Sequence, residues 1–126
     1  MQVLLDTSIL IDFLRKKEES KSIFSQIEAG QIKGFISAVT EAELISGKES
    51  EVERKKLAII KLIKLLKKID VDNNIAQIAG QFRRDYNVSL LDCIIAATAF
   101  SQNVKIWTKN IKDFEKITEI EVEEPY

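Results

Sequence analysis

The first clear feature of the chain is a short run of apolar residues that ends at a carboxylate. Val3, Leu4 and Leu5 are followed at once by Asp6. A continuous apolar run of this length predicts a strand buried on both faces, as in the middle of a parallel sheet. Ligands of open α/β sheets bind just beyond the carboxyl ends of such strands. Asp6 is therefore a candidate site residue, and the same position also suits a helix cap or a turn.

Helical and strand patterns then alternate along the rest of the chain. Apolar spacing predicts helices over 8–17, 20–29, 40–47, 51–68, 73–84 and 88–100, and further strands over 34–39, 69–71, 104–108 and 120–122. We expect Thr40, Asp72 and Ser89 to cap the helices that follow them. The order predicts an α/β fold with a central, mostly parallel sheet of four to five strands, formed by residues 1–126 as a single domain.

The amino-acid composition limits which catalytic groups and metal ligands the chain can provide. The chain has no histidine and a single cysteine, Cys93. Their scarcity excludes Ser-His-Asp and Cys-His catalysis, histidine general bases, and zinc sites built from histidine or several cysteines. Acid–base or metal chemistry must therefore use mainly aspartate and glutamate, whose oxygens suit Mg²⁺ or Mn²⁺. Cys93 lies in an apolar stretch and is expected in the core.

Charge and hydropathy restrict the possible partners and the location. The net charge of −1 gives no overall attraction to nucleic acid, so RNA binding would need local basic patches. No apolar run approaches the roughly 18 residues that span a bilayer. The N-terminal apolar run is interrupted by Asp6 and is not preceded by a basic segment, unlike a signal peptide. We therefore expect a cytoplasmic protein.

Acidic or polar residues recur at strand ends and in first helical turns. The positions are Asp6, Glu43, Asp92, and Asn110 with Asp113. If they met at one edge of a parallel sheet, the carboxylates would repel one another unless a cation lay between them. This predicts one or two divalent ions, as in phosphodiester hydrolysis. For Asp92 the structural alternative is a first-turn acid, stabilised by the helix dipole.

Four motifs together resemble the PIN-domain ribonucleases, specifically the VapC toxins of toxin–antitoxin pairs. The motifs are Leu5-Asp6-Thr7-Ser8, the segment 37–44 with Gly47, the segment 91–99, and the segment 108–114. The resemblance covers essentially the whole chain. It implies an α/β/α sandwich, RNA cleavage that depends on Mg²⁺ or Mn²⁺, a cognate VapB-like antitoxin, and commonly a homodimer.

Residue roles follow from this resemblance. Asp6, Glu43 and Asp92 match the three metal-binding acids, and Ser8 matches a hydroxyl residue that orients the first of them. The fourth position is either Asp113, as a further catalytic acid, or Asn110 as a neutral ligand. Supporting positions are Ser8, Thr108 and Asn110. Candidates for RNA backbone contacts are Arg15, Lys16, Lys48, Arg83 and Arg84.

Two other functions remain open at this point. One is a PIN-fold scaffold that binds RNA or protein with little or no catalysis, although a scaffold would have no need for repelling carboxylates. The other is a receiver-type signalling domain with a phosphoacceptor aspartate. Its usual acidic pair beside the first strand and its lysine near a later strand end are not evident, because Lys109 lies within the last motif.

Overall fold

A five-stranded, entirely parallel sheet forms the centre of the computed structural model, which describes residues 1–126. Its strands are β1 (Gln2–Leu5), β2 (Lys33–Ser37), β3 (Lys67–Ile69), β4 (Lys105–Trp107) and β5 (Val122–Glu123). Their order is β3-β2-β1-β4-β5, so the predicted first strand is the central one. The expected α/β architecture with a parallel sheet is confirmed.

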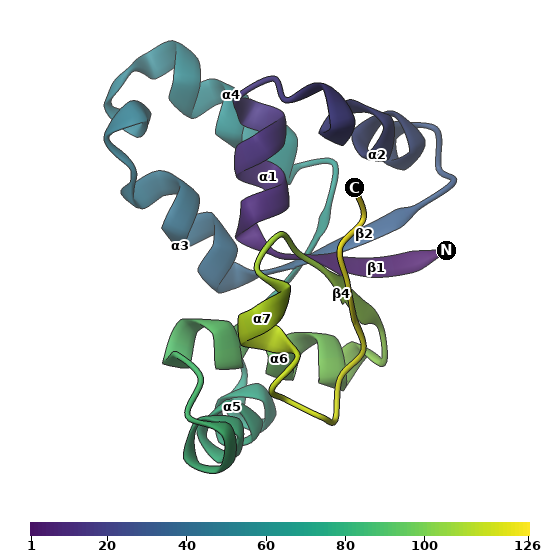
Figure 1. The fold of residues 1–126 in the computed structure, drawn as a ribbon. Coiled ribbons are helices and arrows are strands. Elements are labelled where there is room, and N and C mark those ends of the chain that lie inside the picture. Colours follow the sequence, from purple (N-terminus) through teal and green to yellow (C-terminus); the bar gives the residue numbers. More distant parts are fainter.

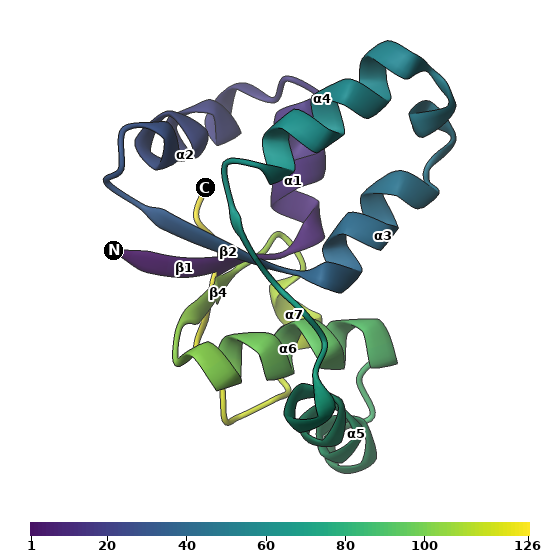
Figure 2. The same cartoon turned by 180° about the vertical axis from the view of Figure 1, so that it is seen from behind.

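Helices cover both faces of this sheet. They are α1 (Thr7–Leu14), α2 (Glu18–Glu28), α3 (Ala38–Ser46), α4 (Glu53–Ile63), α5 (Asn73–Tyr86), α6 (Leu90–Gln102) and α7 (Ile111–Phe114), with a 3₁₀ turn η1 (Lys48–Glu51). Figure 1 shows α1, α2 and α4 on one side of the sheet and α5, α6 and α7 on the other. Figure 2 shows the same two groups from behind.

Strand β1 divides the hydrophobic core into two halves. Val3 and Leu5 pack with α1, α2 and α4, whereas Leu4 packs with α5 and α6. All three side chains are fully buried. Because successive side chains of a strand point to opposite faces, an unbroken apolar run is needed where both faces are covered. Cys93 belongs to the second half of the core, as expected.

Several predicted boundaries were wrong, each for a local reason. The first helix ends at Leu14 because Lys16 adopts a left-handed conformation (φ 62°), so residues 15–17 leave the helix. Strand β2 stops at Ser37, whose hydroxyl accepts a hydrogen bond from the Val39 N–H (3.2 Å) and caps α3. Thr40 is therefore buried inside α3 and is not its cap.

The predicted helix over 51–68 is also too long. Its first residue lies in η1, α4 ends at Ile63, and Lys67 and Lys68 belong to β3. Leucine and lysine favour helices, but pairing of Phe35 with Lys67 along β2 overrides that preference. The predicted third strand is accordingly displaced toward the N-terminus. No helix is both long and apolar enough to cross a bilayer.

The capping predictions for Asp72 and Ser89 are confirmed. The Asp72 carboxylate accepts a hydrogen bond from the Ile75 N–H (2.8 Å) and caps α5. Ser89 caps α6 by accepting from the Asp92 N–H (3.3 Å). Asn87 ends α5 in the left-handed conformation (φ 55°), which asparagine tolerates better than most residues.

Candidate active site

Asp6 lies at the carboxyl end of the central strand and is fixed by two hydroxyl groups. Ser8 Oγ and Thr108 Oγ1 both donate to Asp6 Oδ2, at 2.9 and 2.8 Å. The residue is only 3% exposed. Oδ1 accepts no hydrogen bond, and no buried side-chain oxygen of the chain lacks a partner, so Oδ1 reaches solvent. One oxygen of Asp6 is thus held by the protein and the other is free for a ligand.

The loop after β4 sets the direction of both hydroxyl protons. Ser8 Oγ accepts from the Lys109 N–H (3.1 Å), and Thr108 Oγ1 accepts from the Asn110 N–H (2.9 Å). Each hydroxyl oxygen therefore accepts a hydrogen bond from the backbone of the loop and donates its own proton to Asp6. A hydroxyl with its acceptor role filled is a pre-oriented donor, so Oδ2 of Asp6 is held in a fixed orientation.

Glu43 is oriented from helix α1. Thr7 Oγ1 donates to Glu43 Oε1 (2.6 Å) and is also hydrogen-bonded to the buried Thr40 hydroxyl (3.1 Å). The sequence predicted Thr40 only as a helix cap and indicated no role at the acidic positions for either threonine. The available signal was the position of Thr7 directly after Asp6, at the edge where Glu43 was expected.

The pKa of Asp92 is shifted by its surroundings, including the other acids. Burial raises the pKa of Asp92 above the ordinary value of 3.8, a hydrogen bond with Ser89 lowers it, and the negative charges of Asp6, Asp113 and Glu43 raise it further. Asp6, Asp113 and Glu43 are thus near enough to Asp92 for their negative charges to act on it. None of them takes part in any ion pair of the chain.

These residues fit a hard divalent cation by donor type, although they do not yet enclose one. No three acidic, cysteine or histidine side chains stand close enough together to form a metal-binding group as they are placed. The available oxygens are nevertheless all from carboxylates or amides, which suit Mg²⁺ or Mn²⁺. A cation at this edge would also offset the negative charges that, after burial, raise the pKa of Asp92.

Asn110 and Asp113 are the two candidates for the fourth position, and they differ in charge. Asn110 and Asp113 are both exposed, before and within the short helix α7. Only Asp113 carries a charge that acts on Asp92. The Asn110 side chain makes no capping hydrogen bond. The electrostatic relationship favours Asp113 as the fourth member of the acidic group.

The five basic residues predicted to contact the RNA backbone lie in different parts of the structure. Arg15 and Lys48 line, together with Glu43, a cavity of about 240 Å³ between α1, α3, η1 and α4. Lys16 lines a different groove. At the end of α5, Arg83 donates to Asn87 Oδ1 and the Val88 carbonyl, and Arg84 pairs with its neighbour Asp85 (2.9 Å). Of the five basic candidates, Arg15 and Lys48 are thus the two that share a cavity with Glu43.

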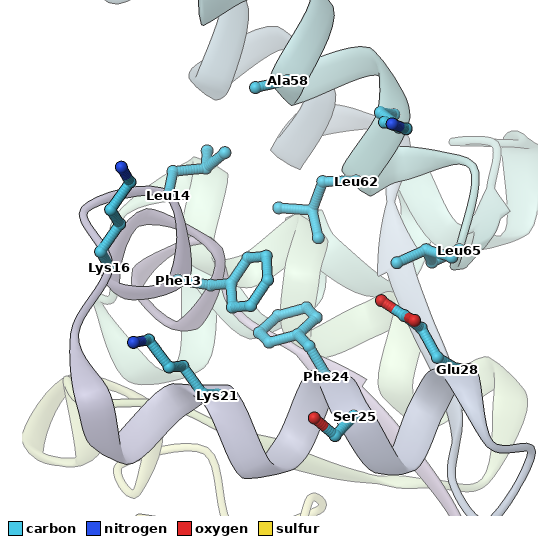
Figure 3. A pocket seen from close by; sticks show the side chains of 11 residues that line it. Phe13, Leu14, Lys16, Lys21, Phe24, Ser25, Glu28, Ala58, Leu62 and Leu65 are labelled. Carbon is cyan, nitrogen blue, oxygen red and sulfur yellow. The ribbon is translucent and has the colours of Figure 1, made fainter.

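A larger groove lies between α1, α2 and α4, on the side of the sheet shown in Figure 3. Its volume is about 890 Å³. Phe13 and Phe24 meet within it, with ring centroids 4.3 Å apart. Other lining residues are Leu14, Ala58, Leu62 and Leu65, with Lys16, Lys21, Ser25, Glu28 and Lys61. An apolar groove that contains several lysines suits a partner segment with apolar and acidic side chains.

A parallel sheet with carboxylates near its carboxyl edge is the arrangement that the resemblance to PIN domains implies. Residues 3–120 match the PIN domain family, and the chain belongs to that family. Its relatives include "Ribonuclease VapC1" of Methanocaldococcus jannaschii, which is 31% identical over 94% of this chain and 82% of the relative. The "tRNA(fMet)-specific endonuclease VapC" of Shigella flexneri is 30% identical over 98% of both chains.

A solved structure agrees with these relatives. The chain superimposes on a toxin–antitoxin complex from Klebsiella pneumoniae with a TM-score of 0.82, at 30% identity and 98% coverage of both chains. The resemblance to VapC-type PIN-domain ribonucleases drawn from the four sequence motifs is therefore confirmed.

Proposed function

We propose that this chain is an endoribonuclease that depends on a divalent metal ion and acts as the toxin of a VapBC-type toxin–antitoxin pair. The observation that carries the proposal is that no basic residue is paired with Asp6, Glu43, Asp92 or Asp113, while burial first, and then the charges of the other three acids, raise the pKa of Asp92. The ribonuclease class is supported by relatives whose names describe ribonucleases and endonucleases.

Asp6, Glu43 and Asp92 would hold the ion, Mg²⁺ or Mn²⁺, with Asp113 in preference to Asn110 as the fourth group. When bound, the ion supplies Lewis acidity toward the scissile phosphate and an activated water. Within the protein, Ser8 and Thr108 hold Asp6 aligned by donating to its Oδ2.

Thr7 performs the same positioning task for Glu43, through its hydrogen bond to Oε1. Carboxylates that are already fixed and partly desolvated need little rearrangement when charge develops during the reaction. The arrangement of hydroxyl donors is thus an argument for a catalytic site and against a scaffold.

The RNA backbone would approach past Arg15 and Lys48, because both line the cavity that also contains Glu43. Neither forms an ion pair within the chain, so both remain available to phosphate oxygens. Lys16, Arg83 and Arg84 are weaker candidates for backbone contacts. Cleavage of RNA is expected in the cytoplasm.

The decisive experiment compares metal binding and RNA cleavage. Calorimetric titration with Mn²⁺ and cleavage of a tRNA and messenger-RNA panel are measured for the unaltered protein, Asp92→Asn and Asp70→Asn. Asp70 is an exposed aspartate outside the site and serves as the control. Loss of both Mn²⁺ binding and cleavage in Asp92→Asn alone supports the proposal. Unchanged cleavage in that variant contradicts it, and RNA binding without Mn²⁺ binding favours the scaffold.

The antitoxin is proposed to dock in the groove of Figure 3, between α1, α2 and α4. Apolar walls with Lys16, Lys21 and Lys61 match a segment that carries apolar and acidic side chains. The test is co-purification with the small protein encoded beside this chain. Leu65→Glu should abolish it, because Leu65 lines the groove and is 41% exposed. Val71→Glu, at a similarly exposed position outside the groove, should not.

A homodimer also belongs to the proposal. Helix α4 leaves Leu57 and Ile60 exposed, whereas Ile75 and Phe82 of α5 are buried in the core. A dimer interface would therefore use apolar residues of α4 rather than those of α5. Sedimentation of Leu57→Glu, compared with the unaltered protein, tests this assignment.

A further inference from the structure

Residues 122–126 make contacts that the sequence motifs did not indicate. After β5 the chain ends on the same side of the sheet as α1 and α2 (Figures 1 and 2). There the Tyr126 hydroxyl donates to Asp12 Oδ2 of α1 (2.6 Å). The Tyr126 side chain is partly buried against the core formed by α1, α2 and α4. Tyr126 is thus anchored on the helix that directly follows Asp6.

Lys109 joins this segment to the candidate active site. Its ammonium group pairs with Glu124 (3.0 Å), donates to the main-chain oxygen of Tyr126, and lies 4.4 Å from the centroid of the Tyr126 ring. These contacts combine an ion pair, a hydrogen bond and a cation–π interaction on one side chain that is 24% exposed. The Lys109 side chain is therefore held in one position by Glu124 and Tyr126.

The backbone of the same lysine faces the acids. The Lys109 N–H donates to Ser8 Oγ (3.1 Å), and Ser8 Oγ donates to Asp6 Oδ2 (2.9 Å). Two hydrogen bonds therefore separate the Lys109 backbone from a carboxylate proposed to hold the metal ion. A displacement of the loop would remove the acceptor partner that orients the Ser8 hydroxyl.

We propose that Tyr126 is a positioning residue for the metal site, which acts by holding Lys109 so that its N–H fixes Ser8 against Asp6. The expected effect of Tyr126 on metal binding rests on the proposed function. The contacts themselves do not depend on a metal. Groups that orient metal ligands from behind commonly change metal affinity by about 10- to 100-fold when they are removed.

The fold should survive loss of the Tyr126 side chain, because the same segment has independent attachments. Thr108 N–H donates to the Glu123 carbonyl (3.1 Å) along β5, and Trp107 Nε1 donates to Glu123 Oε1 (2.9 Å). Lys105 pairs with Glu123 as well (2.9 Å). Removing Tyr126 therefore loosens Lys109 without detaching β5.

The test uses Tyr126→Ala and Lys109→Met, with Tyr86→Phe as the matched control. The Tyr86 hydroxyl contacts Thr118 (3.0 Å) and Glu119, which precede β5 and do not contact Lys109. The first measurement is NMR-detected hydrogen exchange of the Lys109 N–H in metal-free protein. We expect exchange about tenfold faster in the first two variants and unchanged in Tyr86→Phe. If the exchange rate of the Lys109 N–H is unchanged in Tyr126→Ala, the inference is wrong, regardless of the Mn²⁺ affinity.

The second measurement is Mn²⁺ affinity by calorimetry, together with KM and kcat for RNA cleavage. We expect Mn²⁺ affinity to fall about tenfold in Tyr126→Ala and Lys109→Met, with the RNA KM unchanged and the rate restored by excess Mn²⁺. The double variant should be no weaker than either single variant, because both act through one path. Faster exchange with unaltered Mn²⁺ affinity would make Tyr126 merely structural. Absence of Mn²⁺ binding in the unaltered protein would instead reject the proposed function, while the exchange result would still decide the contact path.

Discussion

Thr108 Oγ1 lies 2.8 Å from Asp6 Oδ2, although 102 positions separate the two residues in the chain. The hydrogen bond joins the end of β4 to the end of β1, which are neighbours in the sheet. Because Thr108 is buried and its acceptor lone pair is used by the Asn110 N–H, its proton is directed at Asp6. The hydrogen bond therefore fixes one oxygen of Asp6 from the neighbouring strand.

Thr108→Val should therefore lower RNA cleavage and Mn²⁺ affinity by about 10- to 100-fold while keeping the side-chain volume. The measurement is calorimetry with Mn²⁺ beside a cleavage assay. Thr98→Val is the control, since Thr98 is equally buried but donates only to the Ile94 carbonyl of its own helix (2.7 Å). Equal losses in both variants would mean that threonine removal acts through stability alone.

Thr7 offers a second test, because its hydroxyl orients Glu43 (2.6 Å). Thr7→Val should reduce cleavage by about tenfold or more, and Thr7→Ser should retain most of the activity because the donor is kept. Steady-state kinetics at saturating Mn²⁺ distinguish the two. If serine were as damaging as valine, the methyl group rather than the hydroxyl would be the important part of Thr7.

Asp92→Asn should stabilise the metal-free protein at pH 7. Burial and the neighbouring acids raise the pKa of Asp92 above 3.8, so the folded state binds its proton more readily than the unfolded state does. The ionised form therefore destabilises the fold at neutral pH, and the difference between variant and unaltered protein should vanish below pH 3.8. Urea unfolding across this range measures it. A destabilised variant at pH 7 would show that Asp92 is satisfied by the protein alone.

Tyr126 should make the protein sensitive to alkali. Burial, the hydrogen bond to Asp12 and the charge of Asp12 raise the pKa of Tyr126 above its ordinary value of 10.0. The folded state keeps this proton when the unfolded state has lost it, so stability is lost as the pH rises above 10. Urea unfolding midpoints between pH 9 and 11 should fall less steeply for Tyr126→Phe, and parallel curves would contradict the assignment.

Asn103 ends α6 in the left-handed conformation (φ 53°), which provides a prediction independent of the site. Asn103→Ala should lower the free energy of unfolding by about 1 kcal/mol, because a Cβ without a polar partner disfavours this conformation. Asn103→Gly is the control and should change stability little. Thermal unfolding of the three proteins provides the comparison, and equal loss in both variants would point to the asparagine side chain.

The sequence by itself determined the fold class and was enough to propose which acids form the site. An unbroken apolar strand before Asp6, helices alternating with strands, and the absence of histidine were sufficient for a parallel sheet with carboxylate chemistry. These features are local or compositional, so they can be read without knowing which elements touch. The ends of the helices and strands were predicted less accurately, because pairing between strands, as at Lys67, overrides the local preference for a helix.

The tertiary structure alone decided how those acids are held. The pairing of Thr7 with Glu43, of Thr108 with Asp6, and of Lys109 with Tyr126 joins segments whose separation in the chain carries no local signal. Hydroxyls and lysines occur throughout the sequence, and only the order of strands in the sheet selects the few that lie beside a carboxylate. Periodicity specifies which face a side chain takes, whereas its partner depends on which elements the fold brings together.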